Sequence, residues 1–395
     1  MQYLRHFLQT VILIIVVSLT YRNASGLTKC TVETFCPAGG LEGLPFYFAN
    51  KSFLCATSGI NLILLIVFLI LTLLVARAFC SWICPIGTVC ELMKKISDKL
   101  GISRKKIWDS PFRHLSILKY FVLIAVLYFS YKATDLIFRP FCPYYVIFSW
   151  QTHEVMWWSK WLMVSLISLT MIVPFFWCKI LCPFGAFLIL IRKFSPFALS
   201  DISSNCDNCS KCAENCPQSI DLKKSDFSRT SDCTTCLSCI NKQCPNHIKP
   251  EIKIPFLPKT ALKAIHIPTS VVPVLVIVFF SIGVGISLNF QLPTIRIDYV
   301  KTPDSTCKIN TMNAIVKGVR CRGMANTLSS EMISKIPGIL SMEAYAGEQR
   351  VIISFDSNKT DIEKITNIIN SGTESTDKKT GKKSRKYPFK VEKVE

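Results

Sequence analysis

The sequence FCSWICP, at Phe79–Pro85, directly follows a long apolar run, and WCKILCP, at Trp177–Pro183, follows another. Each copy places two cysteines four positions apart, ends in Cys-Pro and continues through a glycine into a further apolar stretch. A shorter motif, Phe-Cys-Pro, precedes each copy and contributes Cys36 and Cys142. The sequence therefore contains an internal duplication, in which each unit is a helix hairpin with one Cys-Pro and one Cys-x3-Cys-Pro motif.

The apolar runs around these motifs indicate a membrane protein. Hydrophobic residues make up 50% of the 395-residue chain, and several uncharged runs reach the roughly 17–25 residues of a membrane span. We expect an α-helical membrane protein with about five spans, near Tyr3–Thr20, Gly59–Ala78, Leu115–Tyr131, Lys160–Trp177 and Ile267–Leu288. Ala24–Gly26 also resembles a signal-peptidase site, and cleavage there would leave four spans. We favour an uncleaved first span.

Basic residues predict how the spans are oriented. The formal net charge is +20, and Lys and Arg concentrate in Arg77–Arg113 and Lys179–Lys263, which the positive-inside rule places in the cytoplasm. The loops Tyr21–Ser58 and Lys132–Ser159 then lie outside, as does the region after the fifth span. We attribute the charge to topology and to lipid headgroups. The sequence contains no aromatic-basic RNA motif, so we expect no nucleic-acid partner.

The most specific motif is CDNCSKCAENCP, at Cys206–Pro217, which has the Cys-x2-Cys-x2-Cys-x3-Cys-Pro spacing of bacterial ferredoxins. A second copy, CTTCLSCINKQCP, follows at Cys233–Pro245 with one extra residue in its last gap. In two-cluster ferredoxins the cysteine before proline binds the other cluster. That rule assigns one [4Fe–4S] cluster to Cys206, Cys209, Cys212 and Cys244, and the other to Cys233, Cys236, Cys239 and Cys216. Two zinc sites are the alternative, which the two Cys-Pro endings disfavour.

Together these patterns resemble the membrane polyferredoxins of the NapH type, a 4Fe–4S membrane electron-transfer family. The resemblance covers roughly Leu27–Leu288. It implies electron transfer in a membrane with the clusters in the cytoplasm. By motif it carries over Cys80, Cys84, Cys178 and Cys182 together with the eight ferredoxin cysteines, and it leaves the electron donor and acceptor open.

The paired motifs are candidates for a further centre. Cys80, Cys84, Cys178 and Cys182 would converge at the cytoplasmic face if the hairpins pack with pseudo-symmetry, and could hold another Fe–S centre or a soft metal. Cys36 and Cys142 would form a matching outer pair, as a disulfide, a soft-metal entry point or the end of a relay. The alternative is that all six are packing cysteines without a cofactor. Cys30, Cys55 and Cys90 have no repeat partner and receive no role.

The C-terminal region changes to a soluble composition. Its pattern predicts a strand near Ile309–Gly318, a helix near Ala325–Lys335, two further strands, a second helix and a last strand near Tyr387–Val394. This order resembles a heavy-metal-associated domain, with a ferredoxin-like βαββαβ fold. The family motif Gly-Met-x-Cys-x-x-Cys retains its first cysteine as Cys321 and has Met324 at the second. A thiolate and a thioether suit Cu(I), and the alternative is a degenerated loop. Cys307 could be a third ligand or a disulfide partner.

The predicted organisation has four parts. Residues 1–199 form a four-span membrane domain with the two Cys-x3-Cys-Pro repeats, and 200–250 form a cytoplasmic ferredoxin domain with two [4Fe–4S] clusters. Residues 251–290 form a linker and the fifth span, and 300–395 form an extracytoplasmic heavy-metal-associated-like domain. The chain is thus expected to be a multi-pass protein of the inner (cytoplasmic) membrane.

The predicted function is membrane-bound iron–sulfur electron transfer. Electrons would pass between a quinol or a cytoplasmic donor and an extracytoplasmic acceptor, such as a copper ion, a redox partner protein or a metalloprotein. An oxidoreductase activity of the quinol-dehydrogenase or metal-reductase kind is left open. The alternative class is a copper or heavy-metal handling protein, or an assembly protein for a metalloenzyme. A third interpretation is a subunit that supplies electrons to a separate reductase.

Overall fold

The computed structural model divides the chain into two compact units. The first comprises Met1–Leu41, Ile63–Phe129 and Ile137–Ser287, and the second comprises Glu42–Leu62, Ser130–Leu136 and Leu288–Glu395. Each unit is described here by itself. The residues that the structure describes are 1–24, 35–50, 58–101, 115–132, 137–150, 155–199, 216–218, 220, 232–240, 250–252, 265–266, 268–289, 293–300, 307–319, 322–346, 348–371, 374–376, 383–385 and 389–394.

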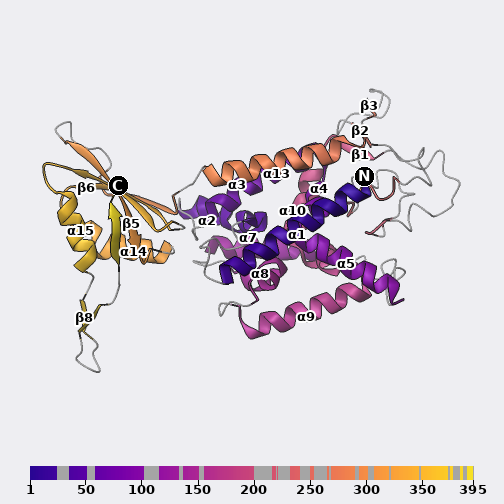
Figure 1. Cartoon of the computed structure of the whole chain (residues 1–395), viewed down its shortest axis with the longest axis horizontal. Helices are drawn as coiled ribbons and strands as arrows, with labels where there is room; N and C mark the ends of the chain where they lie inside the picture. Colours follow the sequence, from indigo (N-terminus) through magenta and orange to yellow (C-terminus); the bar gives the residue numbers. More distant parts are fainter. Residues whose placement is uncertain are drawn as a thin grey trace. The chain divides into compact units, whose positions relative to one another are not determined.

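Long apolar helices form where the sequence has its apolar runs (Figure 1). They are α1 (Gln2–Ala24), α3 (Ser58–Val75), α7 (Leu118–Lys132), α9 (Trp157–Ile172) and α13 (Val271–Asn289). Within the described ranges, Gln2–Arg22 is the one stretch long and apolar enough, by length and composition, to cross a membrane. Gly59–Val75, Pro183–Arg192 and Val271–Ile286 are apolar but shorter. The number of spans therefore stays a prediction.

Each Cys-Pro motif of the duplicated hairpins begins a helix. The helices are α2 (Pro37–Asn50), α5 (Pro85–Lys99), α8 (Pro143–Phe148) and α10 (Pro183–Arg192). Proline suits the first helical position because its fixed φ matches the helix and its missing N–H would have no partner there. The preceding Cys84, Cys142 and Cys182 have extended backbones at the N-cap position. Each motif thus places a thiol at a helix start.

The two repeats also share a break before the Cys-x3-Cys segment. Helix α3 ends at Val75, Ala76 takes a left-handed φ of 55°, and the short helix α4 (Ala78–Trp82) follows. Helix α9 ends at Ile172, Phe175 takes a φ of 60°, and Trp177–Leu181 (η4) forms a π-helical turn. Non-glycine residues seldom adopt positive φ and tend to do so at functional sites. The breaks redirect Cys80 and Cys178 away from the lines of the preceding helices.

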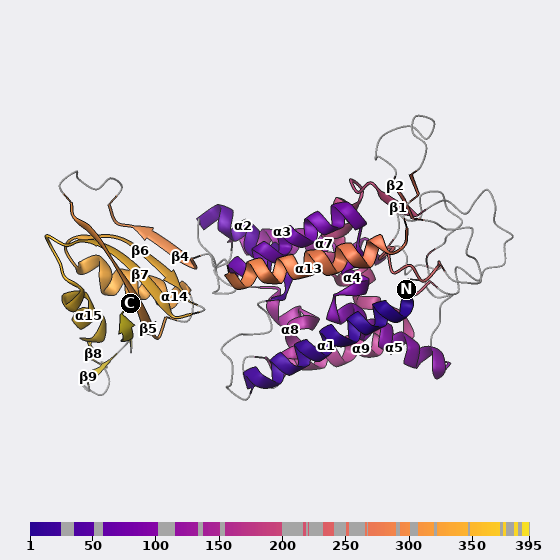
Figure 2. The same ribbon diagram turned by 45° about the horizontal axis from the view of Figure 1, so that its top comes forward.

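The ferredoxin-like segment enters and leaves the first unit at one place. Strand β1 (Phe197–Leu199) pairs antiparallel with β2 (Pro250–Ile252), so Leu199 lies opposite Pro250, and β2 pairs with β3 (Ile265–His266). The two residues that flank the segment 200–249 therefore lie opposite each other. Figure 2 shows these strands at the end of the helical unit that also holds the N-terminus.

The second unit contains an antiparallel sheet in the order β10-β5-β7-β6-β4. Its strands are β4 (Ile295–Asp298), β5 (Ile309–Lys317), β6 (Ile339–Tyr345), β7 (Arg350–Asp356) and β10 (Lys390–Val394). Helices α14 (Arg322–Glu331) and α15 (Ile362–Ser371) share one core with the sheet, through Leu328 and Ile369. From β5 to β10 the elements run βαββαβ, and β4 extends one edge. A short 3-10 turn, η5 (Ile333–Lys335), follows α14, and a separate hairpin of β8 (Glu374–Thr376) and β9 (Lys383–Arg385) precedes β10.

Candidate metal centres

Four of the predicted cluster ligands surround one small cavity. Its lining includes Cys216, Cys233, Cys236 and Cys239, and each of these cysteines is only 8–9% exposed. Thr235 and Leu237, on either side of Cys236, have left-handed φ values of 53° and 57°. This curled backbone turns successive cysteines toward one point. The sequence assigned these four cysteines to one cluster, and the structure brings all four together. The other predicted ligands, Cys206, Cys209, Cys212 and Cys244, lie outside the described residues.

The cysteine loop 232–240 is anchored on the first repeat by its own carbonyl groups. Ser81 Oγ donates to the Thr234 carbonyl at 2.7 Å, and Trp82 Nε1 donates to the Thr235 carbonyl at 3.2 Å. Gln2 Nε2 donates to the Cys236 carbonyl at 3.2 Å, and Arg192 donates to the Cys233 carbonyl. Buried carbonyls without donors would be costly. Side chains of helices α1, α4 and α10 therefore hold the loop in the conformation that brings its cysteines together.

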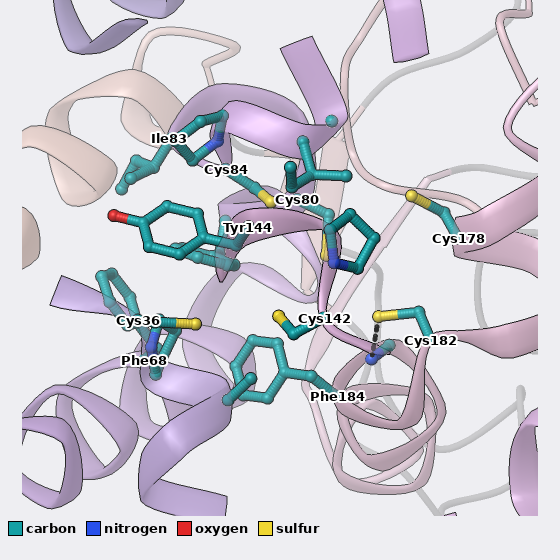
Figure 3. A pocket seen from close by; sticks show the side chains of 18 of the residues that line it. Cys36, Phe68, Cys80, Ile83, Cys84, Cys142, Tyr144, Cys178, Cys182 and Phe184 are labelled. Atoms are coloured by element: carbon teal, nitrogen blue, oxygen red, sulfur yellow. Dashed lines mark hydrogen bonds between the residues drawn. The ribbon is translucent and has the colours of Figure 1, made fainter. Parts of the chain in front are cut away.

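A second, larger cavity of about 300 Å³ lies beside the first. Its lining includes the six cysteines of the duplicated hairpins, Cys36, Cys80, Cys84, Cys142, Cys178 and Cys182. Figure 3 shows these sulfurs pointing toward the middle of the cavity, between aromatic side chains such as Phe68, Tyr144 and Phe184. Gln218 and Thr234 line both cavities. One layer of residues thus separates the two groups of cysteines.

The position of Cys36 and Cys142 corrects the sequence analysis, which placed them a full span away from the other four. Both line the same cavity as Cys80 and Cys178. The reason is that a helix begins directly at each motif. Helix α2 lies between Cys36 and α3 in the sequence, and the sequence analysis did not predict it. The six cysteines are one group and not two.

The glycine of each repeat allows a close approach at the cavity. A Cβ on Gly87 would lie 2.1 Å from the Cys80 carbonyl oxygen, so any side chain there would displace the Cys80 backbone. Gly185, at the matching position, donates its N–H to Cys182 Sγ at 3.2 Å. The sequence analysis noted these glycines as part of the repeat but gave them no function.

Cys90 was also given no function by the sequence. It is 5% exposed and belongs to the apolar core cluster against which Cys178 packs. The position that matches Cys90 in the second repeat is Leu188. Comparison of the two repeats therefore could not identify Cys90. Its place on the helix that begins directly after Cys84 was the one feature of the sequence that pointed to it.

Four cations are buried around the two cavities, which the composition alone did not reveal. Arg77, Lys119, Lys179 and Arg192 are each 2% exposed or less. Asp232 Oδ1 accepts from Lys119 Nζ at 2.6 Å and from Arg77 Nη1 at 3.3 Å. Burial alone would raise the pKa of Asp232, but Lys119 and Arg77 hold that pKa below its usual value. Such a basic interior suits an anionic centre.

The second unit gives less support to the predicted copper loop. Met324 is half-buried and packs against the core of the sheet, while Cys321 lies outside the described residues. Cys307 precedes β5, whereas Cys321 follows it, and this nine-residue strand is about 30 Å long. Because Cys321 lies outside the described residues, the pairing of Cys307 with Cys321, whether as co-ligand or as disulfide, stays a prediction.

No group of three or more His, Cys, Asp or Glu side chains in the described part of the chain is arranged to hold a single metal ion. The cysteines instead line cavities from several sides. Thiolates from Cys are the usual ligands of iron–sulfur clusters, in which each thiolate binds its own iron. The donor set of Cys216, Cys233, Cys236 and Cys239 fits such a cluster.

Comparisons with known proteins agree with this chemistry. A family model described as a 4Fe-4S binding domain matches residues 57–103 and 156–200, which are the two Cys-x3-Cys-Pro repeats. YccM of Escherichia coli strain K12, a protein named for electron transport, is 31% identical over 241 residues, covering 57% of this chain and 65% of YccM. The uncharacterized protein MJ0750 of Methanocaldococcus jannaschii is 30% identical over 197 residues, covering 49% of this chain and 80% of that protein.

A further relative is the methylamine utilization ferredoxin-type protein MauN of Methylobacillus flagellatus, which is 27% identical over 147 residues, covering 36% of this chain and 48% of MauN. No solved structure matches the chain. The repeats and the cysteine loop define a 4Fe–4S ferredoxin-type protein. The chain belongs to the family of iron–sulfur electron-transport proteins that these relatives represent. The match spans just under two thirds of YccM, so the activity and partners of the whole protein are matters for proposal.

Proposed function

We propose that this protein carries electrons through a membrane from a quinol or a cytoplasmic donor to an extracytoplasmic acceptor. The observation that carries the proposal is the pair of adjoining cysteine cavities. Gln218 and Thr234 form a wall common to both, so a cluster held by Cys216, Cys233, Cys236 and Cys239 would lie next to the six cysteines of the hairpins. Short separations between redox groups are what electron transfer requires.

A membrane location is supported by the outer surfaces of the long helices. Large apolar side chains are exposed on α1, α3, α7, α9 and α13, among them Ile14, Ile70, Ile124, Trp161 and Val278. Exposed apolar surface on this scale marks contact with lipid or with another protein. The charged residues Arg77, Lys179 and Arg192 are buried instead. We propose a multi-pass protein of the inner membrane, with the ferredoxin segment in the cytoplasm and the second unit outside.

The residues around the first cavity have distinct tasks in this proposal. Cys216, Cys233, Cys236 and Cys239 would hold a [4Fe–4S] cluster, which supplies one-electron transfer when bound. Ser81, Trp82 and Gln2 hold the loop carbonyls, so the four sulfurs stay in position. A second cluster, at Cys206, Cys209, Cys212 and Cys244, is proposed from the sequence spacing.

The test uses full-length protein purified anaerobically and reconstituted in liposomes. We expect added quinol or dithionite to bleach the visible absorption of oxidised clusters, and Cu(II) or another added acceptor to restore it. The Cys236→Ser variant should lose the part of this response that comes from its cluster, while Cys307→Ser, a cysteine removal in the second unit, should keep the whole response. A wild-type protein whose absorption responds to no donor would contradict the proposal.

Copper handling or metalloenzyme assembly is the second candidate. The βαββαβ order of the second unit, with Met324 beside the Cys321 segment, favours it. Copper binding that is lost in a Cys321→Ser/Met324→Ala variant, in a protein whose clusters do not respond to donors, would support this candidate over electron transfer. Unchanged copper affinity in that variant would show that Cys321 and Met324 do not bind the copper.

A further inference from the structure

We propose that a polar cavity between α1, α5 and the cysteine loop 232–240 binds the phosphate group of an anionic ligand. The cavity has a volume of about 270 Å³ and, among the described residues, shares no lining residue with either cysteine cavity. Its lining includes Arg5 and His6 of α1, Glu91, Lys94 and Lys95 of α5, and Ser238 of the loop. The site goes beyond the proposed function, because no electron has to pass through it.

The buried guanidinium of Arg5 is the first observation that points to an anionic ligand. Arg5 is 2% exposed, and its two Nη atoms donate to the carboxylate of Glu91 at 3.1 and 2.7 Å. Its Nε is also buried and has no hydrogen-bond partner in the described part of the chain. A buried donor without an acceptor is costly, and the guanidinium fork is suited to the oxygens of carboxylates and phosphates. A phosphate oxygen beside Arg5 would supply the missing acceptor.

The charge around the cavity is the second observation. Lys94 and Lys95 line the cavity together with Arg5, whereas Glu91 is the one carboxylate among its described lining residues. Lys94 Nζ also pairs with Asp98, on the next turn of α5, at 2.6 Å. The lining therefore carries more positive than negative charge, which suits an anion better than a neutral ligand. Charge-assisted hydrogen bonds from lysine and arginine are the usual means of holding phosphate.

The cavity can be reached from the surface of the unit. The side chain of Lys95 is 53% exposed and that of His6 is 38% exposed. Lys95 Nζ and His6 Nε2 lie 3.4 Å apart, so these two side chains form one edge of the cavity. A ligand can therefore enter beside them without displacing the buried Arg5.

Two sources can supply the phosphate group, a free phosphate ion and the headgroup of an anionic lipid. Large apolar side chains are exposed on the same turns of the two helices, Leu4 and Phe7 on α1 and Leu92 and Ile96 on α5. Acyl chains could cover these side chains while the headgroup lies in the cavity. Basic pockets between helices at the cytoplasmic side of a membrane bind anionic headgroups in this way. The recognised chemistry is the same for both sources.

A bound phosphate would stabilise the cysteine loop. Gln2 and Ser238 both line the cavity, and Ser238 Oγ donates to Gln2 Oε1 at 3.3 Å. Gln2 Nε2 in turn donates to the Cys236 carbonyl at 3.2 Å. A ligand that binds the folded protein and not the unfolded chain raises the free energy of unfolding. We therefore expect the ligand to raise the melting temperature.

The experiment measures dissociation constants and melting temperatures of full-length protein, freed of lipid in an uncharged detergent. The probes are inorganic phosphate, phosphatidylglycerol and phosphatidylcholine. Binding of phosphatidylglycerol alone would identify a lipid headgroup, and binding of inorganic phosphate would identify free phosphate as a sufficient ligand. Equal affinity for phosphatidylcholine and phosphatidylglycerol would contradict a site for anions. If none of the three probes binds, water alone fills the cavity and the proposal is overturned.

Variants then test whether the bound probe lies in this cavity. Arg5→Lys keeps a positive charge beside Glu91 but loses the Nε donor, and it should weaken binding roughly tenfold, as loss of one charge-assisted hydrogen bond does. Circular dichroism shows whether this variant is folded. Lys94→Gln/Lys95→Gln should weaken binding as well and does not disturb the buried Arg5.

The matched control is Lys99→Gln/Lys193→Gln. It removes the same charge from two exposed lysines of the same unit that do not line the cavity. This control should bind the probe as the wild type does. Equal dissociation constants for Lys94→Gln/Lys95→Gln and for the control would overturn the proposal, whether or not Arg5→Lys is folded.

Discussion

At the residue scale, unusual backbone conformations collect beside the cysteines. Of the non-glycine residues with positive φ in the described chain, Ala76, Phe175, Thr235 and Leu237 flank cysteine motifs, and Gln349 lies in the second unit. Each such residue costs of order 1–3 kcal/mol and persists only where surrounding contacts hold it. Here the contacts are those of the cysteine loop with α4 and of the two Cys-x3-Cys segments with the cavity. Spacing in the sequence identified the cysteines, but it could not identify these supporting residues.

The close approach at Gly87 gives a residue-scale prediction. Because the Cβ of alanine would lie 2.1 Å from the Cys80 carbonyl, Gly87→Ala should push Cys80 out of place. Overpacking of this kind typically costs about 1–3 kcal/mol. We expect a lower melting temperature. Gly285→Ala is the matched control, since its Cβ would meet nothing within 4 Å. Equal melting temperatures of the two variants would contradict the tight packing at Cys80.

At the element scale, the sequence predicted the elements better than their relation to one another. The apolar runs correctly located α1, α3, α7, α9 and α13, because uninterrupted apolar residues of that length form helices. The strand at Ile309–Lys317 and the helix at Ile362–Ser371 also lie where the patterns predicted them. The short helices α2 and α8 were missed as separate elements. Consequently the sequence analysis did not place Cys36 and Cys142 beside the other four cysteines, with which they line one cavity.

The docking of loop 232–240 onto α4 gives an element-scale prediction. Asp232→Asn would leave Arg77 and Lys119 buried without their carboxylate, and loss of one partner of a buried pair typically costs about 3–5 kcal/mol. We expect faster hydrogen exchange in residues 234–240. Asp98→Asn is the control, because its pair with Lys94 joins adjacent helix turns and Asp98 is 34% exposed, where ion pairs contribute about 0–1 kcal/mol. Equal exchange rates in both variants would show that Asp232 does not hold the loop.

At the scale of the whole molecule, the sequence predicted the type of redox chemistry more reliably than the direction of electron flow. The expectation of a 4Fe–4S ferredoxin-type electron-transfer protein is confirmed at the level of family. The resemblance to NapH-type proteins and to heavy-metal-associated domains, the number of clusters and the sidedness of each domain stay predictions. The spacing of cysteines in a short loop predicts cluster ligands, because one loop supplies most of the ligands of a cluster. The electron donor and acceptor are recognised by protein surfaces, and no short motif predicts those surfaces.

The measurement that tests the central claim most directly is the EPR spectrum, with iron determination, of full-length protein purified without oxygen and then reduced. Iron–sulfur electron transfer predicts several irons per chain and low-temperature signals of reduced clusters, which disappear on reoxidation by an added acceptor. Iron-free protein without such signals, prepared under conditions in which a known ferredoxin keeps its clusters, would contradict the claim.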